Sequence, residues 1–248
     1  MIRMNLTVIL GLVLFVNQLF SEDTLIINLI NEPKFDFFEF NDFNERYVET
    51  DRDSITSIDI LSGQILDEKK SDIYLLAFLN SISCDYACPT DYQFSRKNYG
   101  MQFKILASNI DCDTLEIIDN AIVESDSIKV GIFALYTPDF AVKNDLPEGI
   151  DFNPDVFRTA YRQAKVLAIS CDYVLMLSNL GKFIDHDIVN NIPVDVVVSF
   201  DYQKKENGYL ANKRTRFYSI VSGNKKFGRL EFRLRNGRSD FVWQEINY

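Results

Sequence analysis

Histidine is almost absent from this chain. The 248 residues include one histidine, His186, one tryptophan and ten glycines. A Ser-His-Asp triad or a Cys-His dyad would have to use His186, and no nucleophile elbow or other activating pattern surrounds it. No glycine-rich phosphate loop is present either. The sequence therefore shows no recognisable pairing of a nucleophile with a base, and we expect no catalytic residue.

The chain also lacks an apolar run long enough to cross a membrane. Its longest, Leu6 to Val16, is shorter than the ~20 residues that a spanning helix needs. This run follows a short polar start with Arg3 and precedes a small residue, Ser21. The pattern is typical of a secretory signal peptide. We expect residues 1–21 to be removed, residues 22–248 to form a single domain without a transmembrane segment, and the product to be exported, either periplasmic or secreted.

Cysteine is scarce, but its number is even. Cys84, Cys88, Cys112 and Cys171 allow three disulfide pairings, among which the sequence does not choose. Cys84 and Cys88 are four residues apart, and without a neighbouring histidine this spacing gives little support for zinc. We expect these cysteines to form disulfides or to be buried thiols.

The formal net charge of −10 is unevenly distributed. Residues 204–238 contain eleven Lys or Arg and two Glu, a net charge of +9, which leaves −19 for the remainder. Such a basic segment can bind a polyanion or lipid head groups, although it is more often the solvated face of a terminal hairpin. No nucleic-acid-binding motif is present, so we expect no nucleic-acid partner.

Short apolar runs alternate with helical patterns along the chain. Apolar side chains recur at helical spacing over residues 54–70, and the polar residues 84–100 are typical of a loop. A clearer helix begins near Asn153 and Pro154, with an apolar stripe that starts at Phe157. Continuous apolar runs predict buried strands at 25–30, 73–79, 103–108, 128–136, 173–177, 194–199, 217–221 and 229–234. This alternation favours an α/β fold in which helices cover the sheets.

The second half of the chain resembles a known family at several points. Residues 178–181 read Ser-Asn-Leu-Gly and residues 199–203 read Ser-Phe-Asp-Tyr-Gln. Residues 129–139 end in Thr-Pro-Asp, residues 105–110 read Ile-Leu-Ala-Ser-Asn-Ile, and residues 222–230 contain Ser-Gly-Asn-Lys-Lys-Phe-Gly-Arg-Leu. In their order along the chain, these segments resemble the catalytic domain of the 5′-nucleotidase branch of the calcineurin-like metallophosphoesterases. The resemblance implies a four-layer α/β/β/α sandwich.

The family holds two divalent metals with histidines and acids, and these metals activate a water molecule for attack on phosphate. By resemblance, the corresponding strand ends here carry other side chains, and the family's Gly-Asn-His-Glu loop is expected to be deleted between Ser81 and Phe103. The vestigial site positions are Asn31, Pro33, Asn80, Asn179, Asp201 and Gln203. Amide oxygens are poor substitutes for imidazole and carboxylate at a two-metal centre. The resemblance thus implies a fold without its metals.

Two hypotheses follow. The first is an exported pseudoenzyme without a cofactor that binds a small polar ligand or a protein partner. The alternative is a divergent metal-dependent phosphoesterase that holds Mg²⁺ or Mn²⁺ with oxygen ligands such as Asn179 and Asp201. His186 is expected on a helix beyond the site, and it is not a predicted ligand.

Overall fold

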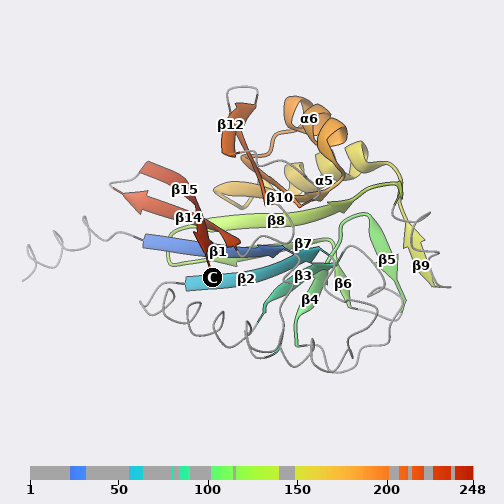
Figure 1. Cartoon of the computed structure of the whole chain (residues 1–248), viewed down its shortest axis with the longest axis horizontal. Helices are drawn as coiled ribbons and strands as arrows, with labels where there is room; N and C mark the ends of the chain where they lie inside the picture. The colour runs from blue at the N-terminus through green and yellow to red at the C-terminus, as the bar shows by residue number, and fades with distance from the viewer. Residues whose placement is uncertain are drawn as a thin grey trace, which may run out of the picture.

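The computed structural model describes residues 23–31, 56–63, 80, 84–89, 102–113, 116–139, 149–200, 207–211, 214–220, 226–235 and 238–247. These residues form two large sheets that face each other (Figure 1). One sheet has seven strands in the order β15-β14-β1-β2-β3-β4-β6. Its strands are β1 (Asp23–Asn31), β2 (Thr56–Gly63), β3 (Tyr86–Pro89), β4 (Lys104–Leu106), β6 (Ile117–Ile118), β14 (Lys226–Arg235) and β15 (Arg238–Asn247).

The second sheet has six described strands in the order β12-β13-β11-β10-β8-β7. They are β7 (Asn120–Glu124), β8 (Lys129–Tyr136), β10 (Tyr173–Asn179), β11 (Val196–Ser199), β12 (Asn207–Ala211) and β13 (Thr215–Ser219). β5 (Ile110–Cys112) and β9 (Ile150–Phe152) form a separate antiparallel pair. The strands β8, β10, β11 and β13 are parallel, as are β1, β2, β3, β4 and β6.

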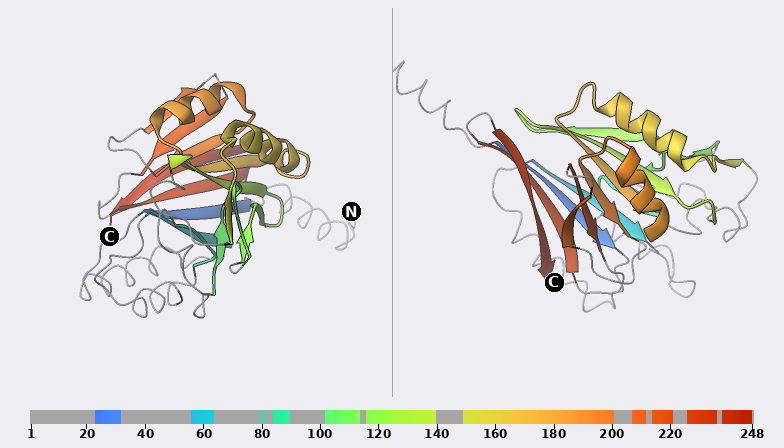
Figure 2. Two further views of the ribbon diagram at one scale, coloured as in Figure 1. Left: turned by 90° about the vertical axis from the view of Figure 1, so that its right-hand side faces the viewer. Right: turned by 90° about the horizontal axis from the view of Figure 1, so that it is seen from above.

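Helices α5 (Val156–Leu167) and α6 (Lys182–Asn191) cover the outer side of the six-stranded sheet (Figure 2). One hydrophobic cluster fills the space between the sheets, with Ile27 from β1 and Leu175 from β10 among its members. A second cluster lies between the six-stranded sheet and the helices and includes Met176 and Ala160. The described layers are therefore helices, sheet and sheet. Any helical layer on the other side of the seven-stranded sheet falls outside the described residues.

The strands expected at 25–30, 103–108, 128–136, 173–177, 194–199, 217–221 and 229–234 correspond to β1, β4, β8, β10, β11, β13 and β14. The prediction of a helix over residues 54–70 is wrong for residues 56–63, which form β2. β2 lies between two parallel neighbours, and its residues from Ile58 to Ser62 are buried. Ile58 and Leu61 are three residues apart, which also fits a helix, and the polar residues Asp59 and Ser62 do not reveal that the strand is buried on both faces.

The loop expected over residues 84–100 is also wrong at its start, where Tyr86–Pro89 form β3. The residue that caps α5 is Asp155, two residues after the predicted cap, Asn153. Asp155 accepts the backbone N–H of Arg158 at 3.1 Å, whereas Asn153 caps the backbone N–H of Asp155. The predicted apolar stripe is shifted too, because Phe157 and Tyr161 are exposed. The expected strand at 73–79 and the phenylalanine-rich residues 34–43 lie outside the described residues.

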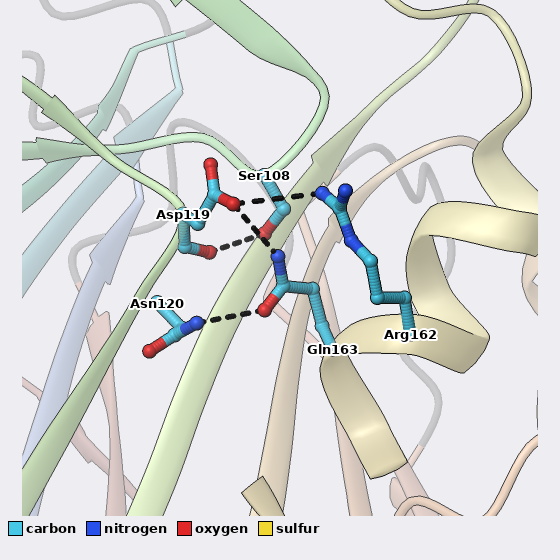
Figure 3. Close-up of polar contacts among 5 residues, drawn as sticks. All are labelled: Ser108, Asp119, Asn120, Arg162 and Gln163. Carbon is cyan, nitrogen blue, oxygen red and sulfur yellow. Dashed lines mark hydrogen bonds and ion pairs between the residues drawn. The ribbon is translucent and has the colours of Figure 1, made fainter. Parts of the chain in front are cut away.

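A polar cluster fixes α5 against the edge of the six-stranded sheet (Figure 3). The buried Gln163 donates to the carboxylate of Asp119 at 3.1 Å and accepts from the amide of Asn120 at 2.7 Å. The hydroxyl of Ser108, which follows β4, donates to the carbonyl of Asp119 at 2.5 Å. One cluster thus joins α5 to both sheets and determines which side of the helix faces outwards.

Candidate functional site

The carboxyl ends of the two sets of parallel strands meet at one edge of the sandwich. Asn31 is the last residue of β1 and is 1% exposed. Its side-chain nitrogen donates to the carbonyl of Ile220 at 2.8 Å and to that of Phe200 at 3.2 Å. Phe200 directly follows β11, and Ile220 directly follows β13. Asn31 therefore ties the seven-stranded sheet to the ends of two strands of the other sheet.

Asn109 makes a second tie between the sheets at the same edge. Its side-chain nitrogen donates to the carbonyl of Tyr136 at 2.9 Å, and its side-chain oxygen accepts the N–H of Tyr136 at 3.0 Å. This amide completes both backbone hydrogen bonds of the last residue of β8. Asn109 belongs to the Ala-Ser-Asn-Ile segment that resembles the family, but the sequence does not predict its hydrogen bonds to Tyr136.

Asn179 ends β10 and is 6% exposed. Side chains alternate along β10, with Leu175 and Leu177 in the cluster between the sheets, so Asn179 points towards the same side. The side-chain oxygens of Asn31 and Asn179 have no hydrogen-bond partner among the described residues. Both are acceptors that are buried from solvent, so only a hydrogen-bond donor that enters between the strand ends could reach them.

The turn after β10 is held by Ser178. Its hydroxyl donates to the carboxylate of the buried Asp185 on α6 and accepts the N–H of Leu180 at 3.1 Å. Gly181 has φ 85°, a conformation that favours glycine, and α6 begins directly after it. These contacts fix the Ser-Asn-Leu-Gly segment and hence the position of Asn179.

None of the other predicted site positions is seen at this edge among the described residues. Asn80 is helical and accepts the N–H of Gln102 at 3.4 Å. The resemblance puts Asn80 at the end of the family's second strand, whereas the strand parallel to β1 is β2, which ends at Gly63. Pro33, Asp201 and Gln203 lie outside the described residues.

All four cysteines are free thiols in the structure. Cys84 and Cys88 are buried, and burial raises the pKa of both thiols. Both sulfurs therefore stay protonated near neutral pH, which is unfavourable for a metal ligand or a nucleophile. Cys112 and Cys171 are half-buried.

His186 lies on α6, as expected. Its ring is half-buried and lies 5.9 Å from the ring of Phe217 on β13, measured between centroids. The side chain thus packs against the core beneath the helix.

A buried polar row crosses the middle of the seven-stranded sheet. The side-chain nitrogen of Asn28 donates to Asp59 on β2 at 3.0 Å, and its oxygen accepts from Arg229 on β14 at 3.0 Å. Burial raises the pKa of Asp59 to about 7; the hydrogen bond from Asn28 lowers this pKa and the charge of Asp85 raises it further. The sequence did not predict this row, because its members are adjacent only through strand pairing.

No protein-family model and no curated protein matches the sequence. The structure, however, resembles the NAD nucleotidase NadN of Haemophilus influenzae with a TM-score of 0.68 at 13% identity, over 92% of this chain and 50% of that one. It resembles a 5′-nucleotidase precursor of Thermus thermophilus with a TM-score of 0.65 at 14% identity, over 92% and 54% of the two chains. The fold is that of the calcineurin-like metallophosphoesterases.

The structure also resembles a protein of Mycoplasma pneumoniae reported as a novel phosphatase. The TM-score is 0.54 at 10% identity, over 92% of this chain and 95% of that one. These likenesses confirm the predicted resemblance to the 5′-nucleotidase branch and the predicted fold class. The chain spans about half the length of the two nucleotidases. At these identities the comparisons establish the fold alone.

The metallophosphoesterase fold implies a two-metal centre, and the described donors at the strand ends do not fit one. Asn31, Asn179 and Ser199 offer neutral oxygens where such a centre needs imidazole and carboxylate. The carboxylate of Asp185 is bonded to Ser178. Within the described ranges no three His, Cys, Asp or Glu side chains come together as a metal-binding group, and no helix is long and apolar enough to span a membrane.

Proposed function

We propose that this protein is an exported, single-domain relative of the metallophosphoesterases that binds a ligand or partner and does not hydrolyse phosphate esters. It needs no metal cofactor in this role. Its binding region is the edge where the parallel strands of both sheets end, around Asn31 and Asn179. Pro33, Asp201 and Gln203 remain proposed positions of the same ancestral site, whereas Asn80 lies on a helix and is not part of it.

The hydrogen bonds of Asn31 carry this proposal. By resemblance, Asn31 stands where the family has the aspartate of its first-strand Asp-x-His. Its nitrogen faces two carbonyl oxygens, at 2.8 and 3.2 Å. A carboxylate in the same place would face these carbonyls without a proton to donate, and its burial would cost several kcal/mol. The position therefore suits an amide donor and opposes a charged metal ligand.

The chemistry of the edge favours a ligand with hydrogen-bond donors. The unpartnered oxygens of Asn31 and Asn179 are acceptors, and neither carries a charge. A neutral polar molecule or a donor-bearing segment of a protein partner would satisfy them without the desolvation cost of an ion. We therefore place a small polar ligand first and a protein partner second.

The start of β1 supports export. Cleavage near Ser21 would leave Asp23 close to the new amino terminus, and β1 begins at Asp23. The carboxylate of Asp23 accepts the hydroxyl of Ser125 at 2.8 Å and the N–H of Ser127 at 2.6 Å. A cut near Ser21 would therefore leave these contacts of Asp23 in place.

An assay with a generic aryl phosphate and Mn²⁺ tests the absence of catalysis. We expect no turnover above that of the Asp201→Ala variant, which removes the acid that the alternative hypothesis needs. Turnover in the original chain that disappears in Asp201→Ala would instead establish a divergent metal-dependent phosphoesterase. Amino-terminal sequencing of protein recovered from the cell exterior or periplasm tests export, and an intact Met1 would contradict it.

A further inference from the structure

The outward side of α5 combines positive charge with exposed apolar side chains. Gln163 and its contacts fix the inward side of the helix, where Ala160, Ala164 and Leu167 are buried. The opposite side is defined here as the outer face of α5. It consists of Phe157, Arg158, Tyr161, Arg162, Lys165, Val166 and, just beyond the helix, Ile169.

The outer face of α5 is positive in a chain of net charge −10. Residues 156–170 contain three cations and no acid. Arg162 is partly neutralised by the carboxylate of Asp119 at 3.5 Å (Figure 3). Arg158 and Lys165 form no ion pair with a described residue, and the ammonium of Lys165 lies 4.7 Å from the ring centre of Tyr161. Two cations on this face are thus available to an anionic partner.

Apolar side chains lie between these cations. Ile169 is 86% exposed and Val166 is 53% exposed, so both aliphatic side chains face solvent. The rings of Phe157 and Tyr161 are also exposed on the same helix. A helix that lies in a membrane interface needs both kinds of group, because its cations meet the head groups and its apolar side chains reach the acyl boundary.

We infer that the outer face of α5 docks on an anionic lipid surface. The helix lies on the outside of the molecule (Figures 1 and 2), so it can approach a bilayer side-on. Arg158 and Lys165 bind the head groups, and Val166 and Ile169 enter the layer beneath them. An acidic protein would match the charges equally, but it would gain little from isolated aliphatic side chains on a convex helix. This site is separate from the strand-end region.

Vesicle flotation tests this inference. The full chain, and in parallel the chain that starts at Glu22, is floated with vesicles of phosphatidylcholine alone or of phosphatidylcholine mixed with phosphatidylglycerol. We expect binding to the anionic vesicles, and weaker binding at high salt. Each Lys or Arg near an anionic membrane surface increases the partition coefficient between membrane and water by a factor of roughly five. Arg158→Gln with Lys165→Gln should therefore weaken binding by roughly twenty-five-fold, and Val166→Ser with Ile169→Ser should weaken it further.

Matched controls separate α5 from general effects. Lys104→Gln with Lys129→Gln changes the net charge equally at exposed positions outside α5. Phe183→Ser removes an exposed ring from α6. Both controls should bind like the original chain. Equal binding to both kinds of vesicle, normal binding by the α5 variants, or binding to soluble polyglutamate without binding to vesicles would each overturn the inference.

Discussion

The side-chain nitrogen of Asn31 lies 2.8 Å from the carbonyl oxygen of Ile220, a residue 189 positions later in the chain. The bond joins the end of β1 to the end of β13 and thus joins the two sheets. Under the proposed resemblance, it places an amide donor at the position of one of the family's metal ligands. In this chain, the strand ends are joined to each other by hydrogen bonds of Asn31, which close this edge of the sandwich.

Asn31→Asp tests this tie. The carboxylate would lose two hydrogen bonds and face two carbonyl oxygens, so we expect a loss of stability on the order of 3 kcal/mol and no gain of phosphatase activity. Urea unfolding measures the change in free energy. Asn190→Asp makes the same substitution at an exposed position of α6 and should change stability by about 0.5 kcal/mol or less. Equal stability of Asn31→Asp and the original chain would contradict the account.

Stability should depend on pH through Asp59. Its folded pKa is raised from 3.8 to about 7, so its contribution favours the folded state below pH 3.8 and is lost as the pH rises towards 7. We expect the free energy of unfolding to fall between about pH 5 and pH 7, by at most about 1.4 kcal/mol per pH unit from this group.

Asp59→Asn keeps an oxygen acceptor for Asn28 and removes the titration. This variant should be more stable than the original chain at pH 8, and its unfolding free energy should vary less over the same range. Urea unfolding at pH 5, 6, 7 and 8 measures both effects. Parallel pH profiles of the two proteins would exclude Asp59 as the cause.

Continuous apolar patterns predicted the strands of the core, whereas contacts between distant segments required the structure. β8 and β10 were found because their residues are apolar without interruption, and α6 was found after β10. The helical spacing of Ile58 and Leu61 predicts a helix at β2, whereas pairing with β1 and β3 makes this segment a strand. Asn31 and Asn179 could be placed at strand ends by resemblance. The partners of Asn31 could not be predicted, because they are 169 and 189 residues away.

Gly228 and Trp243 give a test of packing between β14 and β15. A Cβ atom on Gly228 would lie 2.1 Å from the ring of Trp243, which stacks on Tyr218 with 4.7 Å between ring centres. Gly228→Ala should displace the ring and cost about 1–3 kcal/mol. Trp243 is the single tryptophan, so its fluorescence emission should shift to longer wavelength. Ser127→Ala at an exposed turn should leave the spectrum unchanged; an unchanged spectrum for Gly228→Ala would refute the predicted clash.

Asp119 contacts both a buried amide, Gln163, and an exposed cation, Arg162, so the contributions of the two contacts to stability can be compared. Gln163→Met removes two hydrogen bonds from a buried position and should cost about 2 kcal/mol. Arg162→Gln removes the exposed pair with Asp119 at 3.5 Å and should cost less than about 1 kcal/mol. Thermal or urea unfolding compares the two variants. The reverse order of losses would show that Arg162, rather than Gln163, holds α5 against the sheet.

The metal content of the native protein tests the central claim most directly. Protein purified without chelators and dialysed against buffer containing Mn²⁺ can be analysed by inductively coupled plasma mass spectrometry. The account predicts far less than one bound divalent metal ion per chain, and the same value for Asp201→Ala. Two tightly held ions per chain, reduced by Asp201→Ala, would contradict the claim that the strand ends have lost the metal centre.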